Sequence, residues 1–372
     1  MQEDFHYYAT YCAAILAGYS HEESMEICYS AQFVDMCSKT YLASIKAPLS
    51  AATTQLQLEM MDARTDIIGL QEITRIWASF HFLPKDLYAK KKWRPKVYMN
   101  KYRLICGPNS DLMVKMVELA KGKPLQNVGI AMHVLADTWA HAYYAGTPSL
   151  VINGTTAEFY EIVQDGDGEK EIPIHFRHSA STPDDLDKHI FTNSLYQGNE
   201  KSIMNLGHGR AGHLPDYSFA KYRFYPAWGD YGDIVKDNPS DYYKAFCQMV
   251  YAMKYIREKE LFFEKDTYHV PEVAPYRKRI DQILRKRQII ACDDWKAFGE
   301  ELSGQTIEDF DIDRFKSEYI EVAEEHKKDT FLGKFIDGAI AHKAMVSNEI
   351  SSSGSFLAGF VQVKIHDKIS KS

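Results

Sequence analysis

Three residues with metal-binding side chains recur at every fourth position in one stretch of the chain. They are His133, Asp137 and His141, in the sequence HVLADTWAHAYYAG that begins at residue 133. Each step of four residues advances about 400° around an α-helix, so the three side chains would share one face. His133 and His141 would lie roughly 12 Å apart along the axis, too far for both to bind one ion through bonds of about 2 Å. The spacing therefore predicts a site with more than one ion, in which Asp137 bridges neighbouring ions.

A second concentration of candidate ligands lies in a glycine-rich segment, LGHGRAGHLPDYSF. His208, His213 and Asp216 fall within nine residues there. Glycine lets a backbone adopt unusual torsion angles, so such a loop can direct two imidazoles and a carboxylate at one ion. A surface loop with incidental histidines is the competing interpretation, and the combination of residue types favours the site.

The other candidates are isolated residues. His6 lies near the start of the chain, and Asp35 lies in the apolar context QFVDMC. A buried carboxylate needs a partner, which can be a basic group, the backbone or a metal ion. His81 lies between two phenylalanines in FHF, where a histidine is more often a core residue than a ligand. His342 stands alone in a predicted final helix and is expected to be structural.

Apolar residues at helical spacing run through much of the chain, so helices are expected to position these ligands. Residues 5–47 fit two helices, the first ending near Gly18 and the second beginning with a capping box of Ser20 and Glu23. Within 108–146, a short amphipathic helix precedes the helix that carries the first three ligands. That second helix is apolar on nearly all sides, so we expect it in the middle of a bundle.

The fold class expected from these patterns is all-α, a multi-helix bundle with a small β-containing insertion. Further helices are predicted at 48–83 and 239–264. Residues 147–205 contain β-branched runs broken by NG and DGDG, which predict a small β-hairpin. We expect residues 1–264, with this insertion, to form a metal-binding core, and 265–372 to form a helical extension packed on it.

The overall charge argues against a broad nucleic-acid surface. The chain has 372 residues and a net charge of 44 − 51 = −7, whereas phosphate contacts need a basic surface. No stable nucleic-acid binding is therefore expected. The basic, aromatic segment at 85–103 fits either a solvated surface or a rim that faces an anionic substrate.

Other features bear on cellular location. The six cysteines include no C-x-x-C pair, so they are expected to be reduced and mostly buried. No apolar run approaches the ~20 residues of a membrane span. The opening MQEDFHYY lacks the pattern of a signal peptide, so the expected location is cytoplasmic.

The order of the candidate ligands resembles that of an all-helical superfamily, the zinc-dependent phospholipases C and single-strand-specific zinc nucleases. The shared order is an early histidine, an aspartate on a helix, a histidine flanked by apolar residues, then His-x3-Asp-x3-His and a late pair of histidines with an acid. The stretches MQEDFHYYATYCAAILAG, QFVD and HVLADTWAHAYYAG look more like a further bacterial branch of this superfamily than either named class. The resemblance spans roughly residues 1–250.

The resemblance implies two or three zinc ions and a set of ligands for each. Asp35, His81, His133 and Asp137 would hold one ion; His141, Asp216 and either His208 or His213 a second; and His6 and Asp137, with the N-terminal backbone, a third. Asp35 and Asp137 are the residues expected to be catalytic.

Imidazole and carboxylate ligands suit zinc, and a bridging carboxylate holds two ions at the spacing of binuclear hydrolases. Such ions produce hydroxide from bound water near neutral pH and neutralise charge on a phosphoryl group. We therefore expect hydrolysis of a small or lipid-derived phosphate ester by a metal-bound hydroxide. The alternative is a non-catalytic helical binding or regulatory protein with a structural metal site, which the acidic charge favours.

Overall fold

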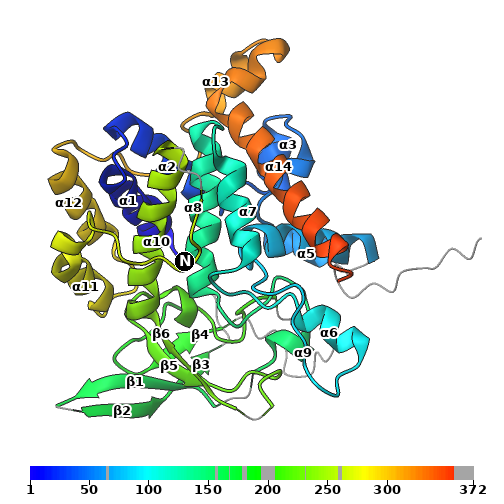
Figure 1. Cartoon of the computed structure of the whole chain (residues 1–372), viewed down its shortest axis with the longest axis vertical. Helices are drawn as coiled ribbons and strands as arrows, with labels where there is room; N and C mark the ends of the chain where they lie inside the picture. Colours follow the sequence, from blue (N-terminus) through cyan, green and yellow to red (C-terminus); the bar gives the residue numbers. More distant parts are fainter. Residues whose placement is uncertain are drawn as a thin grey trace, which may run out of the picture.

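Helix α8 (Leu125–Ala140) runs through the middle of a layer of helices in the computed structural model of the chain (Figure 1). It packs against α2 (His21–Phe33), α10 (Asn238–Glu258) and α14 (Phe331–Ser352). Every residue from Val128 to Ala140 is buried. The predicted central position of this helix is therefore confirmed.

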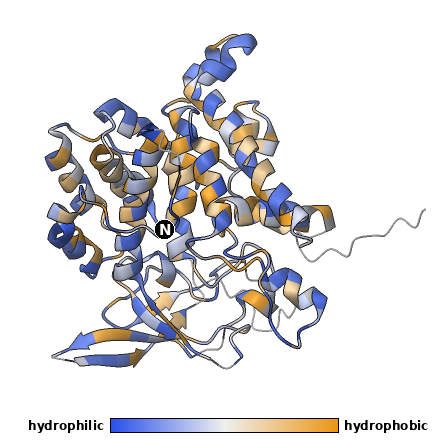
Figure 2. Cartoon of the chain, in the orientation of Figure 1, coloured by the Kyte–Doolittle hydropathy of each residue, from blue (hydrophilic) through white to orange (hydrophobic). Residues whose placement is uncertain are grey.

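The structure describes residues 1–63, 67–155, 158–166, 168–177, 182–193, 206–230, 232–258 and 262–355. Apolar residues are concentrated along the central helices, while hydrophilic residues colour much of the outer helices (Figure 2). Within these ranges, none of the helices combines the length and the apolar character needed to cross a membrane. All six cysteines are free, and five of them are buried.

A close contact between α2 and α8 depends on the absence of a side chain at Gly129. A Cβ atom there would lie 2.4 Å from the carbonyl oxygen of Ile27 and 2.5 Å from the Cβ of Ser30. Such separations are too short for real atoms, so any other residue would push the two helices apart. The contact brings the turn after α2, which carries Asp35, next to His133 in the middle of α8, with Oδ1 of Asp35 3.9 Å from Nε2 of His133.

The N-terminal segment forms a π-helical stretch, Asp4–Ala9, followed by α1 (Thr10–Leu16). Gly18 then adopts a left-handed conformation with φ of +88°, which ends the helix as predicted. The capping box of α2 is also confirmed. Ser20 Oγ accepts from the backbone N–H of Glu23 at 3.2 Å, and the carboxylate of Glu23 accepts from the backbone N–H of Ser20 at 2.8 Å.

Further helices connect α2 to α8. The predicted helical stretch at 48–83 divides into a 3-10 turn (Leu49–Ala51), α4 (Gln57–Ala63) and α5 (Ile67–Phe80). The others are α3 (Lys39–Ser44), α6 (Lys96–Tyr102), α7 (Asp111–Ala120) and, after α8, α9 (Leu150–Asn153). His81 directly follows α5, so this helix carries it to the side of α8.

A four-stranded antiparallel sheet forms a second layer beneath the helices (Figure 1). Its order is β2-β1-β5-β6, with β1 at Tyr160–Asp165, β2 at Gly168–Pro173, β5 at Lys221–Phe224 and β6 at Ile234–Asp237. Two further strands, β3 (His175–Arg177) and β4 (Ile190–Thr192), pair in parallel. The chain is thus a mixed α and β structure, and the expectation of an all-α bundle is wrong.

The predicted hairpin exists as β1 and β2, but its partner strands were missed for a physical reason. β5 and β6 have four residues each and lie within a segment rich in glycine and aromatic residues. So few residues give too little alternation to indicate a strand. The sheet has its own apolar core, in which Phe159 stacks on Phe224 with centroids 5.5 Å apart.

The C-terminal part adds α11 (Arg277–Arg285), α12 (Cys292–Ser303) and α13 (Lys316–Glu321) before α14. One 3-10 turn, Ala274–Tyr276, directly precedes α11, and another, Glu324–Asp329, lies between α13 and α14. Trp295 on α12 packs edge-on against Phe5, and α14 packs against α8 and α5. These contacts join both parts in one apolar core, and the division at residue 264 stays a prediction.

Candidate metal centre

The two carboxylate oxygens of Asp137 face different groups, as a bridging ligand requires. Oδ1 lies 2.7 Å from the α-amino nitrogen of Met1 and 3.2 Å from Nε2 of His6. Oδ2 lies 3.3 Å from Nδ1 of His81 and 3.3 Å from Nε2 of His133. Four groups, from the N-terminus, from the residue after α5 and from α8 itself, thus meet at one buried carboxylate.

His141 extends this cluster from the end of α8, where the helix gives way to a turn. Its Nδ1 lies 3.5 Å from Oδ2 of Asp137, and its Nε2 lies 3.0 Å from Oδ1 of Asp216. The α-amino group of Met1 lies between the carboxylates of Asp137 and Asp216, 3.2 Å from Nε2 of His141. His208 completes this end, with Nε2 3.5 Å from Oδ2 of Asp216. The glycine-rich loop therefore meets the His141 end of α8, as predicted.

Eight of the nine predicted ligands form three groups, two of which share His133, and in each group the candidate ligand atoms lie within 4.8 Å of one another. The groups are His6, His133 and Asp137; Asp35, His81 and His133; and His141, His208 and Asp216. Donors that share one ion lie about 3–4 Å apart, because each is about 2 Å from the metal. Each group can therefore hold a metal ion. Among the described residues, none of these groups contains both His133 and His141.

Backbone carbonyl groups fix which nitrogen of each imidazole faces the cluster. Nε2 of His81 lies 3.0 Å from the carbonyl oxygen of Thr53, and Nδ1 of His133 lies 2.9 Å from that of Ala31. A carbonyl oxygen only accepts, so these nitrogens carry the hydrogen and donate it. The remaining nitrogen of each ring then presents its lone pair to the cluster.

The same arrangement recurs at the other end of the cluster. Nδ1 of His141 donates to the carbonyl oxygen of His81 at 2.7 Å, and Nδ1 of His208 donates to that of Gly212 at 2.7 Å. Histidines that bind metals usually donate their second N–H in this way, which fixes the tautomer and the ring orientation. Four imidazoles are thus oriented as metal ligands are.

The lone pairs of two of these rings point at one another. Nδ1 of His81 and Nε2 of His133 are 3.3 Å apart. Since the opposite nitrogen of each ring already donates to a carbonyl, the facing pair is repulsive unless a cation lies between the two rings. A second proton on one ring or a bound metal ion can supply that charge. Oδ1 of Asp35 lies 3.7 Å from Nδ1 of His81 and 3.9 Å from Nε2 of His133, close enough to stabilise that positive charge.

His6 is buried with both ring nitrogens lacking a hydrogen-bond partner among the described residues. An unsatisfied buried polar group costs about 1–3 kcal/mol. Burial and the nearby His133 lower the pKa of His6 to about 4, so the imidazole is neutral near pH 7. A neutral imidazole with a free lone pair 3.2 Å from Asp137 has the form that a metal ligand needs.

Charge in the cluster is dominated by carboxylates. Burial alone would raise the pKa of Asp137, but His141 and the Met1 ammonium hold it well below its usual range. Burial likewise opposes ionisation of Asp216, whose pKa is kept low by His208 and the same ammonium. The α-amino pKa, although lowered by burial, is raised to about 11 by Asp137, Asp216 and Asp35. One ammonium faces three carboxylates, so the site attracts further positive charge.

The ninth predicted ligand, His213, lies at the rim. Its side chain is 58% exposed, and its Nδ1 is 3.5 Å from Oδ2 of Asp216. A hydrogen bond to that carboxylate raises the pKa of His213. Of the two alternatives for the second ion, the structure therefore groups His208 rather than His213. The cluster reaches solvent on the sides of Asp35, at 28% exposure, and His208, at 18%.

Several groups at the site carry no signal in the sequence. The orienting carbonyls of Ala31, Thr53 and Gly212 belong to the backbone, which every residue provides. Positive φ angles of 54° at Gly207 and 58° at Gly212 show where this loop requires glycine. His342, by contrast, is structural as expected: it is buried and its Nε2 donates to the carbonyl oxygen of Ser79 at 2.8 Å.

Comparison with known proteins gives a family but no described activity. No curated protein and no solved structure matches the chain. The sequence model of a family of unknown function (DUF6765) matches residues 1–350, which include all nine predicted ligands and every described helix up to the last turns of α14. The chain therefore belongs to the DUF6765 family.

Proposed function

We propose that this protein is a metal-dependent hydrolase of phosphate esters, with zinc as the metal. The observation that carries the proposal is the pair of facing lone pairs on His81 and His133, 3.3 Å apart and each fixed by a backbone carbonyl. An ordinary core histidine would pair its second nitrogen with a donor. Within the described part of the chain, the polar contacts of these two nitrogens are with each other and with two carboxylates, Asp35 and Asp137.

The donor set favours zinc over harder cations. The three groups together offer five imidazoles and three carboxylates. Calcium and magnesium prefer oxygen ligands, whereas imidazole suits zinc and related transition metals. The cysteines are not involved, since no group of candidate ligands in the described chain includes one.

Bound zinc lowers the pKa of a coordinated water to about 7 and neutralises charge on a phosphoryl group. The protein itself would hold the metal-binding side chains in fixed positions away from solvent. His6, His133 and Asp137 are buried completely or nearly so, and they form the inner side of the cluster, away from solvent. Asp35 and His208 reach solvent, so a phosphate ester would approach across them. Asp35 is also the carboxylate best placed to exchange protons with water.

Metal analysis of the purified chain, coupled to an activity assay, tests this function. After dialysis against zinc and removal of excess, we expect at least two zinc ions per chain. Bis(4-nitrophenyl) phosphate and 4-nitrophenyl phosphate should be hydrolysed, and chelation should abolish turnover. Asp137→Asn should lose both properties, whereas Asp337→Asn, at an exposed position on α14, should keep both. Less than one zinc ion per chain would exclude the proposal.

Complete burial of part of the cluster favours one alternative, a structural metal site in a non-catalytic protein. His6 and His133 are 0% exposed, which suits an ion that stabilises the fold. Under this alternative, zinc raises the melting temperature but neither ester is hydrolysed. The two functions therefore differ in turnover and agree in metal content.

A further inference from the structure

A cavity of about 510 Å³ adjoins the segment that follows α8. Its walls include Trp139, Tyr143, Trp228 and Tyr102, together with Lys85 and Lys244. None of the metal-ligand candidates lines it. The imidazole of His141 lies between Trp139 and Tyr143 in sequence but points the other way, towards Asp216 and the carbonyl oxygen of His81.

The aromatic walls are held in place by their own contacts. Tyr143 and Trp228 stack with centroids 6.2 Å apart and an interplanar angle of 25°. The indole N–H of Trp228 donates to the carbonyl oxygen of Tyr143 at 3.1 Å, and Tyr102 packs edge-on against Trp228 at 6.0 Å. Rigid rings of this kind bind flat apolar groups with little loss of side-chain entropy.

Two lysines and two aspartates line the cavity, and with Lys236, which pairs with the lining Asp241, the local net charge is 3 − 2 = +1. Within the described chain, neither Lys85 nor Lys244 lies within ion-pair distance of a carboxylate, although Lys244 lies 5.8 Å above the ring of Trp139. Both carboxylates that line the cavity have partners on residues outside its lining. Asp86 accepts from the backbone N–H of Tyr88 at 2.8 Å, and Asp241 pairs with the buried Lys236 at 2.6 Å.

We propose that this cavity binds an aromatic anion. The ring system would lie against Trp139, Tyr143 and Trp228, and its carboxylate, sulfonate or phosphate group would pair with Lys85 and Lys244. Selectivity for an aromatic anion requires both features, because the rings alone would bind any apolar molecule and the lysines alone would bind any anion. This binding does not depend on the proposed hydrolase, because the cavity and the metal cluster use different side chains.

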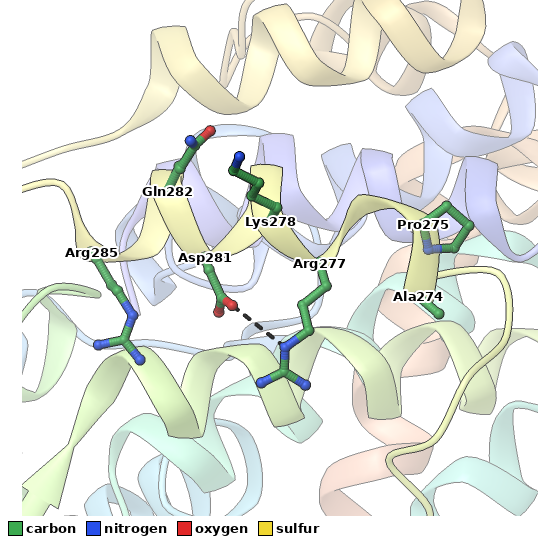
Figure 3. A pocket seen from close by; sticks show the side chains of 7 residues that line it. All are labelled: Ala274, Pro275, Arg277, Lys278, Asp281, Gln282 and Arg285. Atoms are coloured by element: carbon green, nitrogen blue, oxygen red, sulfur yellow. Dashed lines mark ion pairs between the residues drawn. The ribbon is translucent and has the colours of Figure 1, made fainter.

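A basic depression on α11 provides an internal comparison (Figure 3). It is lined by Arg277, Lys278 and Arg285, and Arg277 pairs with Asp281 at 3.5 Å. Figure 3 shows that its side chains come from one helix and the turn before it, and no aromatic ring lines it. It therefore offers charge without an aromatic wall, and Lys278 serves as a matched control for Lys85 and Lys244.

Calorimetric titration of the full chain with 2-naphthalenesulfonate tests the proposal, because this aromatic anion has no phosphate ester to hydrolyse. We expect one binding site per chain, with affinity at least tenfold weaker in Lys85→Gln/Lys244→Gln and unchanged in Lys278→Gln. 2-Naphthol, which is neutral, and inorganic sulfate, which lacks a ring, should each bind at least tenfold more weakly. Both zinc-loaded and chelated protein should bind the probe.

Four results would overturn this assignment. Unchanged affinity in the double lysine variant would show that the probe binds elsewhere. Equal affinity for 2-naphthol would show that the cavity binds apolar rings and does not recognise the negative charge. Tighter binding of benzyltrimethylammonium than of the sulfonate would show that the rings recognise a cation. Binding that requires zinc would assign the probe to the metal cluster. Failure of hydrolysis in the earlier assay would leave the calorimetric result intact, so the two proposals are tested separately.

Discussion

The rings of His6 and His133 stack with centroids 3.8 Å apart and an angle of 20° between their planes. His133 is fixed by the carbonyl of Ala31, whereas His6 has no hydrogen bond in the described structure. One member of the stack is therefore held by a backbone carbonyl, and the other by packing and by the Asp137 carboxylate, 3.2 Å from its Nε2. Without metal, Nδ1 of His6 has no partner among the described residues, which destabilises the fold, and a bound metal ion would remove that cost.

This relationship predicts opposite effects of His6→Leu in two states. In the metal-free protein, leucine removes an unsatisfied buried imidazole at similar volume, so the free energy of unfolding should be unchanged or higher by about 1 kcal/mol. In the presence of zinc, the stabilisation conferred by metal should fall sharply. Urea unfolding with and without zinc measures both values. His326→Leu, at an exposed position, is the control, and a uniform loss of stability in both states would contradict the role of His6.

Asp137→Asn tests the bridging carboxylate. The amide keeps the shape of the side chain but loses the charge that faces Met1, His6 and the other imidazoles. Zinc affinity should fall at least about tenfold, since an amide is a poor zinc ligand and no longer bridges. Competition with a chromogenic chelator measures the affinity. Retention of full zinc binding would remove Asp137 from the centre of the site.

Gly129→Ala tests whether the approach of α2 to α8 positions the ligands. The added methyl group would overlap the backbone at Ile27, so we expect a loss of about 1–3 kcal/mol in the free energy of unfolding. Zinc content should fall as well, because the turn that carries Asp35 moves away from His133. Gly168→Ala, where the nearest atom would be 3.9 Å away, is the control and should change neither property.

His342 predicts a pH dependence that is independent of metal. Burial lowers the pKa of His342 to about 4 in the folded chain, below the usual histidine pKa of about 6.5. Below pH 6.5 the unfolded chain therefore binds a proton that the folded chain rejects, so stability falls as pH falls towards 4. The loss should reach about 2 kcal/mol between pH 7 and pH 5. His342→Asn should flatten this slope in chelated protein, whatever its effect at pH 7, and an unchanged slope would assign the dependence to other groups.

The sequence was informative about the helix that carries the ligands and about the ligands themselves. Residues at steps of four on α8, together with the loop of His208 and Asp216, indicated a multinuclear arrangement because spacing alone excludes a single ion. Isolated ligands such as Asp35 and His81 could be proposed only through resemblance, since one residue has no periodicity. The structure brings them together because α2 and α5 both pack on α8.

The sheet was predictable only in part. The hairpin of β1 and β2 has strong turn residues, whereas β5 and β6 are too short to show a pattern and are stabilised by pairing with β1 and each other. The choice of His208 over His213 also depends on tertiary structure. Both lie near Asp216 in sequence, and only the folded loop decides which ring turns inward.

The carbonyl groups of Ala31 and Thr53 orient two ligands without using their side chains. A different residue at either position would offer the same oxygen, provided that the backbone keeps its path. Ligand orientation should therefore tolerate replacement of these side chains and respond instead to small displacements of the α2 end and of the segment before α4. Engineering of metal specificity at this centre would have to move backbone, for which insertions or deletions in these two segments are better tools than point substitutions.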